Sequence, residues 1–221
     1  LAAALDYIRA TPAIWEVILT GGDPLILSPR RLSEIVSTLN VIPHVAVIRV
    51  HSRIPIAAPE RVTDDLIAAL SATSKPVYLS VHCNHADELT VNVKAALARL
   101  RSKGVTLLSQ SVLLRGVNDS PTALEALFRS LAANGVKPYY LHHLDHAPGT
   151  SRFRIPLAEG RALFKSLRGR VSGLALPTYV IDIPGGAGKV PVSASFVSTS
   201  TDGEVVVEDP RGTSHNLGNS Y

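Results

Sequence analysis

The chain has 221 residues, 46% of them hydrophobic and 18% charged, with a formal net charge of +4 and a pI near 9.4. A chain of this length and composition can bury a full core, and we expect one soluble, globular α/β domain. Its apolar runs stop well short of the ~18 residues of a membrane span, and its basic residues are scattered, so neither a membrane segment nor a nucleic-acid partner is expected.

The chain contains one cysteine, Cys83, and no methionine. A single cysteine excludes an internal disulfide and is compatible with a reducing compartment, which favours a cytoplasmic protein. Residues 1–10 have the pattern of a helix and lack the layout of a signal peptide. We therefore expect a fragment of a longer protein, whose N-terminal part precedes Leu1.

Six apolar runs typical of β-strands recur along the chain, separated by segments with helical periodicity. The strands are expected at 15–20, 45–50, 76–82, 105–112, 137–142 and 175–183. The helices are expected at 1–10, 29–39, 59–70, 88–103, 121–134 and 157–168. Pro29, Pro59 and Pro121 mark helix starts, because proline is favoured in the first turn. Trp15 and the aliphatic residues of the strands are expected in the core.

The alternation of strands and helices predicts βαβ units around a parallel sheet. Two architectures fit this pattern, a barrel and an open doubly wound sheet. Polar residues follow nearly every predicted strand instead of gathering at one crevice. They are Gly21-Gly22-Asp23, His51-Ser52-Arg53, His82 to His85, Gln110-Ser111, Asp145, and Asp182 to Lys189. This distribution favours a β/α barrel, in which many strand ends converge on one site.

Lys189 ends a glycine-rich turn that follows the last predicted strand. Glycines at 185, 186 and 188 allow positive φ angles and a close approach of the backbone to a bound group. A lysine on such a loop, beside free backbone N–H groups, suits a Schiff base with an aldehyde cofactor that carries a phosphate. Asp182 would place a carboxylate near the lysine amine. The alternative is a solvated surface turn with no chemical role.

The C-terminal part of the chain changes in character. Residues 193–208 predict a β-hairpin with a turn at Asp202-Gly203. Residues 211–221 are polar and are expected to form a loose tail or an interface segment. We expect a barrel over residues 1–190 and a hairpin with a tail over residues 191–221.

Six blocks of sequence, in a fixed order, resemble one known family. They are Thr20 to Leu25, Arg49 to Pro55, His82 to His85, Gln110 to Asp119, Lys137 to Tyr140, and Pro184 to Lys189. Together they resemble the lysine 2,3-aminomutase family of radical S-adenosylmethionine enzymes. The resemblance implies a partial (βα)6 TIM-like barrel of the radical SAM type with a C-terminal β-hairpin. The first strand and the cluster loop of that barrel would lie before Leu1.

The resemblance also implies a site for pyridoxal phosphate and L-lysine. Lys189 matches the lysine that holds pyridoxal phosphate in the family. Asp145 and Asp182 match the two carboxylates that hold the distal ammonium of lysine. Ser52 and Arg53 are candidates for contact with an anionic group of a cofactor, although a packed or solvated arginine fits the sequence equally well.

A second set of positions is implied for S-adenosylmethionine. Gly21, Gly22 and Asp23 match the glycine-rich motif that receives the methionine amino group. His82 and Gln110 match positions that the family uses around the same cofactor. Taken alone, Asp23 would be read as a turn residue.

Two features depart from the family pattern. Its members bind a [4Fe-4S] cluster through three cysteines spaced C-x3-C-x2-C, and Cys83 stands alone, so no metal ligand is assigned to this chain. His82 and His85 flank Cys83, but their spacing at a strand end does not form a chelating face. His142-His143 replaces the Tyr-Gln pair found near the aldehyde ring in the prototype.

The implied function is an isomerase that shifts the amino group of L-lysine from C2 to C3 by a radical mechanism. It would need pyridoxal phosphate, S-adenosylmethionine, the cluster and an external electron donor, and it is compatible with a homo-oligomer. Two roles fit, free lysine metabolism and the supply of β-lysine for elongation factor P. The polypeptide alone is expected to be inactive. The alternative is a non-catalytic barrel that binds pyridoxal phosphate or another phosphate ligand.

Overall fold

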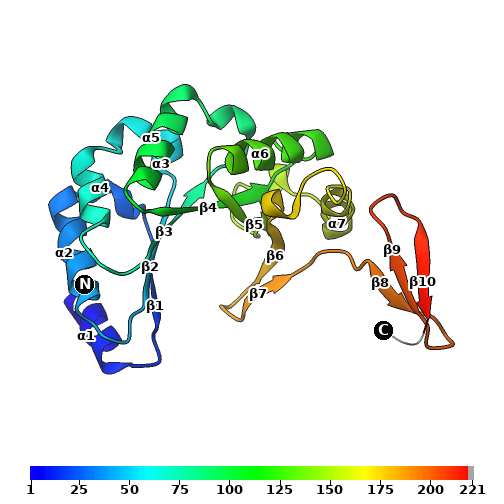
Figure 1. The fold of residues 1–221 in the computed structure, drawn as a ribbon, viewed down its shortest axis with the longest axis horizontal. Helices are drawn as coiled ribbons and strands as arrows, with labels where there is room; N and C mark the ends of the chain where they lie inside the picture. Colours follow the sequence, from blue (N-terminus) through cyan, green and yellow to red (C-terminus); the bar gives the residue numbers. More distant parts are fainter. Residues whose placement is uncertain (219–221) are drawn as a thin grey trace.

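The computed structural model describes residues 1–218 as a curled sheet with helices along its convex side (Figure 1). Six strands run parallel in chain order, each paired with the next, and β7 adds an antiparallel edge. They are β1 (Glu16–Leu19), β2 (Val47–Ser52), β3 (Val77–His82), β4 (Thr106–Leu113), β5 (Lys137–His143), β6 (Thr178–Ile183) and β7 (Gly188–Pro191). The order β1 to β7 leaves β1 and β7 as the two edges, so over the described residues the sheet is a half-barrel. The predicted α/β partial barrel is confirmed.

Seven α-helices connect or flank these strands. They are α1 (Ala2–Ala10), α2 (Pro29–Asn40), α3 (Ile54–Ala57), α4 (Asp64–Leu70), α5 (Val91–Ser102), α6 (Pro121–Ala133) and α7 (Leu157–Lys165). Two of the predicted proline starts are confirmed. The Ser28 Oγ accepts from the Arg31 N–H at 3.3 Å, and the Ser120 Oγ accepts from the Ala123 N–H at 3.1 Å. Each serine supplies an acceptor that the first turn lacks, so both helices begin at the following proline.

Two predicted helices begin later than expected. The segment from Pro59 forms a short 3-10 turn, and α4 starts only after Thr63, whose Oγ1 accepts from the Leu66 N–H at 3.2 Å. Likewise, α5 starts after Thr90 instead of at Glu88. In both places the threonine cap, and not the apolar periodicity, determines where the helix begins. The threonine side chain accepts a hydrogen bond from an N–H of the first turn, which would otherwise be unpaired.

The two faces of the sheet differ in polarity. Every second residue of a strand points to the convex side, and those that do so, such as Ile48, Val50 and Leu79, are fully buried under the helices. Their neighbours, among them Arg49 and His51, point to the concave side, because successive side chains of a strand lie on opposite faces. The helices thus stabilise the sheet from outside, and the concave face is left to polar groups.

Gly160 lets α7 pack directly against β6. A Cβ at this position would lie 2.2 Å from the Tyr179 hydroxyl and 3.1 Å from Leu113 Cδ2. Tyr179 is fully buried, and its hydroxyl hydrogen-bonds to His143 Nδ1 at 2.7 Å. A side chain at 160 would therefore displace an aromatic residue that has no free space around it.

We expect Gly160→Ala to destabilise the protein by about 1–3 kcal/mol, even though alanine is favoured over glycine inside a helix by about 1 kcal/mol. In urea unfolding, the Gly160→Ala/Tyr179→Phe double variant should lose less stability than the sum of the two single variants, because removing the hydroxyl removes the closest clash. Strict additivity of the two changes would contradict this packing argument.

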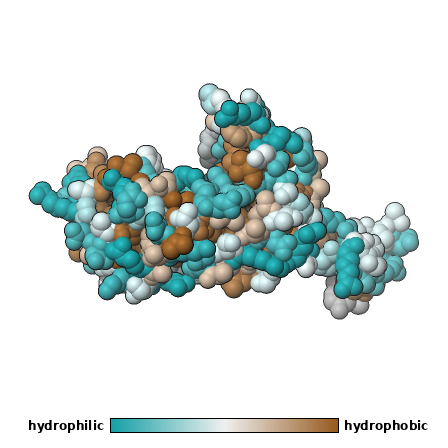
Figure 2. Space-filling view, turned by 90° about the horizontal axis from the view of Figure 1, so that it is seen from above, coloured by the Kyte–Doolittle hydropathy of each residue, from teal (hydrophilic) through white to brown (hydrophobic). Residues whose placement is uncertain are grey.

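The C-terminal residues form a separate antiparallel sheet of three strands, at one end of the long axis of the molecule (Figures 1 and 2). The predicted hairpin is confirmed as β8 (Val197–Thr199) and β9 (Val205–Glu208). For the described part of residues 211–221, the expectation of a loose tail is wrong, because β10 (Ser214–Gly218) pairs with β9. The alternative, an interface segment, stays a prediction. Asp209 accepts from the Arg211 and Thr213 N–H groups and closes the turn, so β9 supplies a partner for a polar segment that has no strand pattern of its own. Residues 219–221 lie outside the described part.

Trp15 is not part of the core. Its side chain is 60% exposed, because it stands just before the edge strand β1, which has a neighbour on one side only. The expectation that it is buried is therefore wrong. Across residues 1–218, we find no helix of the length and apolarity that a bilayer crossing requires.

Candidate functional site

The carboxyl ends of the parallel strands meet at a hollow of about 470 Å³. Its walls include five of the residues predicted from the sequence, namely Arg53, His82, Gln110, Asp145 and Asp182. In a curled parallel sheet the strand ends converge at one rim, which brings together side chains far apart in sequence. The structure therefore places these predicted residues around a single site.

Lys189 belongs to a chain of four hydrogen-bonded side chains that crosses this rim. Its ammonium contacts Asp182 Oδ1, and the other carboxylate oxygen, Oδ2, lies 2.9 Å from His142 Nδ1. The second ring nitrogen of His142 lies 3.2 Å from Gln110 Nε2. The chain links β4, β5, β6 and β7, so the predicted lysine and carboxylate are coupled to the predicted Gln110 through His142.

The charges in this chain shift the pKa values of its members. Burial opposes ionisation of Asp182, but its hydrogen bonds with Lys189 and His142 outweigh burial and lower its pKa. Burial lowers the pKa of His142 and outweighs the attraction of Asp182. Asp182 is therefore a carboxylate and His142 a neutral imidazole near pH 7.

The turn that carries Lys189 depends on its glycines. Gly185 and Gly186 have φ angles of 82° and 79°, which side chains rarely adopt. The turn reverses the chain so that Lys189 pairs with Asp182 across β6 and β7. Lys189 thus lies on the return strand rather than in the loop, and the register of this hairpin brings amine and carboxylate together.

Asp23 fixes the end of β1 to the end of β2. Its Oδ1 accepts from the Ser52 hydroxyl at 2.7 Å and from the Leu25 N–H at 3.0 Å, and its Oδ2 accepts from the Arg53 N–H at 2.7 Å. Gly21 and Gly22 precede it with φ angles of 79° and 42°. Asp23 is therefore a well-held carboxylate whose Oδ2 accepts one hydrogen bond from the described residues.

Ser52 and Arg53 are both engaged with protein groups. Ser52 is buried and donates to Asp23. The Arg53 guanidinium donates to the His82 carbonyl oxygen at 3.0 Å and forms an ion pair with Glu88. Glu88 in turn accepts from the His85 N–H at 2.9 Å. These contacts stabilise the loop after β3, and Arg53 still borders the hollow.

Several buried polar atoms on the concave face have no hydrogen-bond partner among the described residues. They are His51 Nε2, Ser80 Oγ, His82 Nε2 and Gln110 Oε1. Buried polar groups in proteins are normally paired, and unpaired ones raise the free energy of the site. His51 and His82 lie edge to face with ring centroids 6.2 Å apart. The concave face therefore offers a group of polar atoms suited to a polar ligand.

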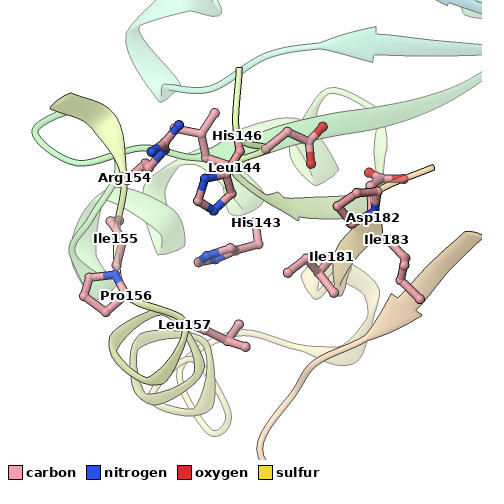
Figure 3. Close-up of a pocket in the computed structure, with 12 residues that line it drawn as sticks. His143, Leu144, His146, Arg154, Ile155, Pro156, Leu157, Ile181, Asp182 and Ile183 are labelled. Atoms are coloured by element: carbon pink, nitrogen blue, oxygen red, sulfur yellow. The ribbon is translucent and has the colours of Figure 1, made fainter. Parts of the chain in front are cut away.

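A larger pocket, of about 830 Å³, adjoins the hollow at Asp145 and Asp182 (Figure 3). Its walls are mainly apolar, with Ile155, Pro156 and Leu157 on one side and Ile181 and Ile183 on the other. Asp145 is exposed on the loop after β5, and Asp182 projects from β6. The two predicted carboxylates thus border the same space from neighbouring strands.

Cys83 is a structural residue. It is fully buried, its thiol contacts the His85 carbonyl oxygen, and burial raises its pKa to about 12. Such a thiol is protonated at neutral pH and is a poor metal ligand. Within residues 1–218, no group of three His, Cys, Asp or Glu side chains is arranged to hold a metal ion.

His142 and His51 were not among the residues assigned from the sequence. Period-two alternation places Tyr140 and His142 on one face of β5, and Arg49 and His51 on one face of β2, so the sequence held a signal for the concave face. The partners of His142 come from other strands, and only the register of the folded sheet identifies them.

Comparison with known proteins gives a consistent result. Residues 164–215 match the family model described as Lysine-2,3-aminomutase. The chain is 40% identical over 95% of its length to L-lysine 2,3-aminomutase of Fusobacterium nucleatum subsp. nucleatum, of which it covers 49%. Over 96% of its length it is 37% identical to the Bacillus subtilis protein of that name, and it covers 45% of that protein. Over 86% it is 40% identical to the Escherichia coli protein of that name, and it covers 55% of that protein. The chain spans about half the length of these curated relatives.

Two solved structures support the fold. Streptococcus suis SuiB matches 82% of this chain with a TM-score of 0.60 and 10% identity, and the match covers 43% of SuiB. SuiB bound to S-adenosylmethionine matches with a TM-score of 0.57 over the same shares of the two chains. At this identity the similarity concerns the fold alone.

Proposed function

Because this chain belongs to the lysine 2,3-aminomutase family, we propose that it carries the amino-acid and cofactor contacts of an isomerase that moves the amino group of L-lysine from C2 to C3. The observation that supports this most directly is the contact between Lys189 and Asp182 at the rim of the half-barrel. An amine and a carboxylate on adjacent strands can serve an aldehyde cofactor and a cationic substrate in one place. The product would be β-lysine.

The residues present fit pyridoxal phosphate. Lys189 is partly exposed, so an aldehyde can reach its amine, and it lies beside the carboxylate of Asp182. The glycine-rich turn before Lys189 has backbone N–H groups at residues 185–187, which suit a phosphate. When bound, pyridoxal phosphate supplies a conjugated ring through which the substrate nitrogen can migrate.

The residues present also fit S-adenosylmethionine. His82 and Gln110 line the hollow, and their buried Nε2 and Oε1 atoms make no hydrogen bond of good geometry to another described residue. The two side chains are near each other, since burial lowers the pKa of His82 and Gln110 opposes that shift. Asp23 Oδ2 has room to accept a further donor such as the methionine amino group. When cleaved, S-adenosylmethionine supplies the radical that removes hydrogen from an unactivated carbon, which no side chain can do.

The residues present do not fit the [4Fe-4S] cluster. The chain has a single cysteine, which is buried with a raised pKa. No step is therefore derived through a cluster bound by these residues. We propose that the cluster ligands, and with them activity, come from outside this polypeptide, together with an external electron donor.

In this proposal each side chain of the site has a physical task. Asp182 and Asp145 hold the distal ammonium of lysine by charge-assisted hydrogen bonds, each worth roughly 1.5–3 kcal/mol. Lys189 would hold the aldehyde cofactor through its amine. His82, Gln110 and Asp23 orient S-adenosylmethionine toward the substrate. The apolar walls of the larger pocket help to exclude water from the side of Asp182.

The proposal is tested by adding pyridoxal phosphate to the chain. We expect a visible absorption band, and after borohydride reduction a covalent adduct on the peptide that contains Lys189. Lys189→Ala should lose both the band and the adduct. Lys94→Ala is a matched control, because Lys94 is exposed on α5 away from the hollow.

A band of unchanged strength in Lys189→Ala, or an adduct found mainly on another lysine, would exclude the assigned role of Lys189. Circular dichroism of the variant should match that of the unchanged chain, so that loss of the band cannot be attributed to unfolding.

A further inference from the structure

Asp182 offers its two carboxylate oxygens to two different cations or donors. Oδ1 contacts the Lys189 ammonium, and Oδ2 lies 2.9 Å from His142 Nδ1. The side chains of Asp182 and His142 are 30% and 13% exposed, so solvent screens this contact only in part. The orientation of the carboxylate is therefore set by the two groups together.

The direction of the hydrogen bonds follows from the chemistry of the partners. An ionised carboxylate only accepts, so His142 must carry its proton on Nδ1 and donate it to Asp182. Burial lowers the pKa of His142, and the neutral ring therefore has no proton on Nε2. Nε2 then accepts from Gln110 Nε2–H at 3.2 Å. Gln110 thus fixes the tautomer that serves Asp182.

A carboxylate with one oxygen already occupied distinguishes between cations. A guanidinium binds a carboxylate best through two parallel N–H donors, one for each oxygen. An ammonium is a compact charge and needs only one oxygen from each carboxylate. A guanidinium fork on Asp182 would have to share Oδ2 with the His142 N–H, whereas an ammonium needs only Oδ1.

We propose that His142 is a specificity-determining positioning residue, which engages one oxygen of Asp182 so that the site binds the terminal ammonium of lysine in preference to the guanidinium of arginine. This inference rests on the proposed function, because it assigns Asp182 to the distal end of the substrate. It adds a residue that does not touch the reacting atoms and that acts through Asp182.

Lys189 itself occupies Oδ1 in the structure. Oδ1 has a second lone pair, so a ligand ammonium can bind beside the lysine amine or take its place. The other charged groups around the hollow are Asp145 and Arg53. Arg53 is paired with Glu88, and Asp145 is exposed on its loop, so Asp182 is the carboxylate that His142 controls.

The test uses the chain loaded with pyridoxal phosphate and follows its visible spectrum during titration with L-lysine or L-arginine. The measured quantity is the ratio of the two apparent dissociation constants. In His142→Phe, which keeps the ring but has no N–H, the preference for lysine should fall about tenfold, since a charge-assisted hydrogen bond becomes available to arginine. In His142→Asn, whose amide can still donate to Asp182, the preference should stay close to that of the unchanged protein.

His44→Phe is the matched control, because His44 binds the Ile8 carbonyl oxygen far from the hollow. Gln110→Leu gives a second test that leaves His142 in place, and it should reduce the preference for lysine by releasing the ring.

An unchanged ratio in both His142→Phe and Gln110→Leu, with normal lysine titration, would overturn the role of His142 and leave the proposed function intact. Equal weakening of both amino acids would also overturn it, since that is the effect of a purely structural residue. No Lys189-dependent band in the unchanged protein would overturn the proposed function and this inference together.

Discussion

Replacement of Asn118 by leucine should destabilise the protein by about 3–5 kcal/mol. Asn118 is fully buried, and its amide makes three hydrogen bonds to backbone groups. Its Nδ2 donates to the Asn84 and Val112 carbonyl oxygens at 2.9 and 2.8 Å, and its Oδ1 accepts from the Leu114 N–H at 2.8 Å. Leucine has a similar size but would leave all three backbone groups buried and unpaired.

The Asn118→Leu replacement should disturb the hollow as well as lower the stability of the protein. Asn84 lines the hollow, and its own Oδ1 accepts from the Val112 N–H at 2.8 Å, so Asn118 fixes the loops that follow β3 and β4 together. Urea unfolding gives the loss of stability. Asn92→Leu is the control, because Asn92 is exposed on α5, and we expect a change within about 0.5 kcal/mol. A loss below about 1 kcal/mol for Asn118→Leu would show that these loops hold together without the amide.

The stability of the protein should fall as the pH is lowered from about 6.5 toward 4, in part because of His51. Burial, followed by the nearby Arg49 guanidinium, lowers the pKa of His51 from 6.5 to about 4. In this pH range the unfolded chain binds a proton at His51 that the folded protein excludes. The folded state therefore loses stability as the pH falls and regains it as the pH rises. Since one pKa unit corresponds to about 1.4 kcal/mol, the contribution of His51 should reach about 2–3 kcal/mol.

The measurement is the free energy of unfolding of the unchanged protein and of His51→Gln, at several pH values between 7.5 and 4.5. Glutamine does not titrate, so the variant should show a shallower decline. His82, His142 and His143 also have pKa values lowered by burial, so part of the decline should remain. Identical slopes for the two proteins would show that His51 is protonated in the folded state as easily as in the unfolded chain.

The sequence predicted the sheet better than the helix starts and the chain end. Each predicted strand is present, because period and composition report directly on which residues a parallel sheet buries. The starts of α4 and α5 were missed, since Thr63 and Thr90 end the preceding irregular segment by a local hydrogen bond that periodicity does not detect. Strand β10 was missed because its stability depends on β9 and on the Asp209 turn instead of on its own pattern.

The candidate site was predicted as a set of residues but not as a network. Lys189 and Asp182 could be selected from the sequence because they stand close together in one local segment, and Gln110 because of the resemblance to the family. His142 was noticed only as a departure from the family pattern, and its two contacts could not be predicted, because they span 40 and 32 residues along the chain. Ser52 and Arg53 were selected as contacts for an anionic group, and the structure shows that their side chains hold Asp23 and the loop after β3.

The sequence by itself determined the alternation of strands and helices, the family and the chemistry available at the strand ends, because these follow from residue type and order. Only the tertiary structure decided which oxygen of Asp182 faces Lys189 and which faces His142, and which polar atoms of the concave face lack a partner among the described residues. These properties depend on the register between strands and on the curl of the sheet. A shift of one residue in the register of a strand would turn its concave-side side chains toward the helices.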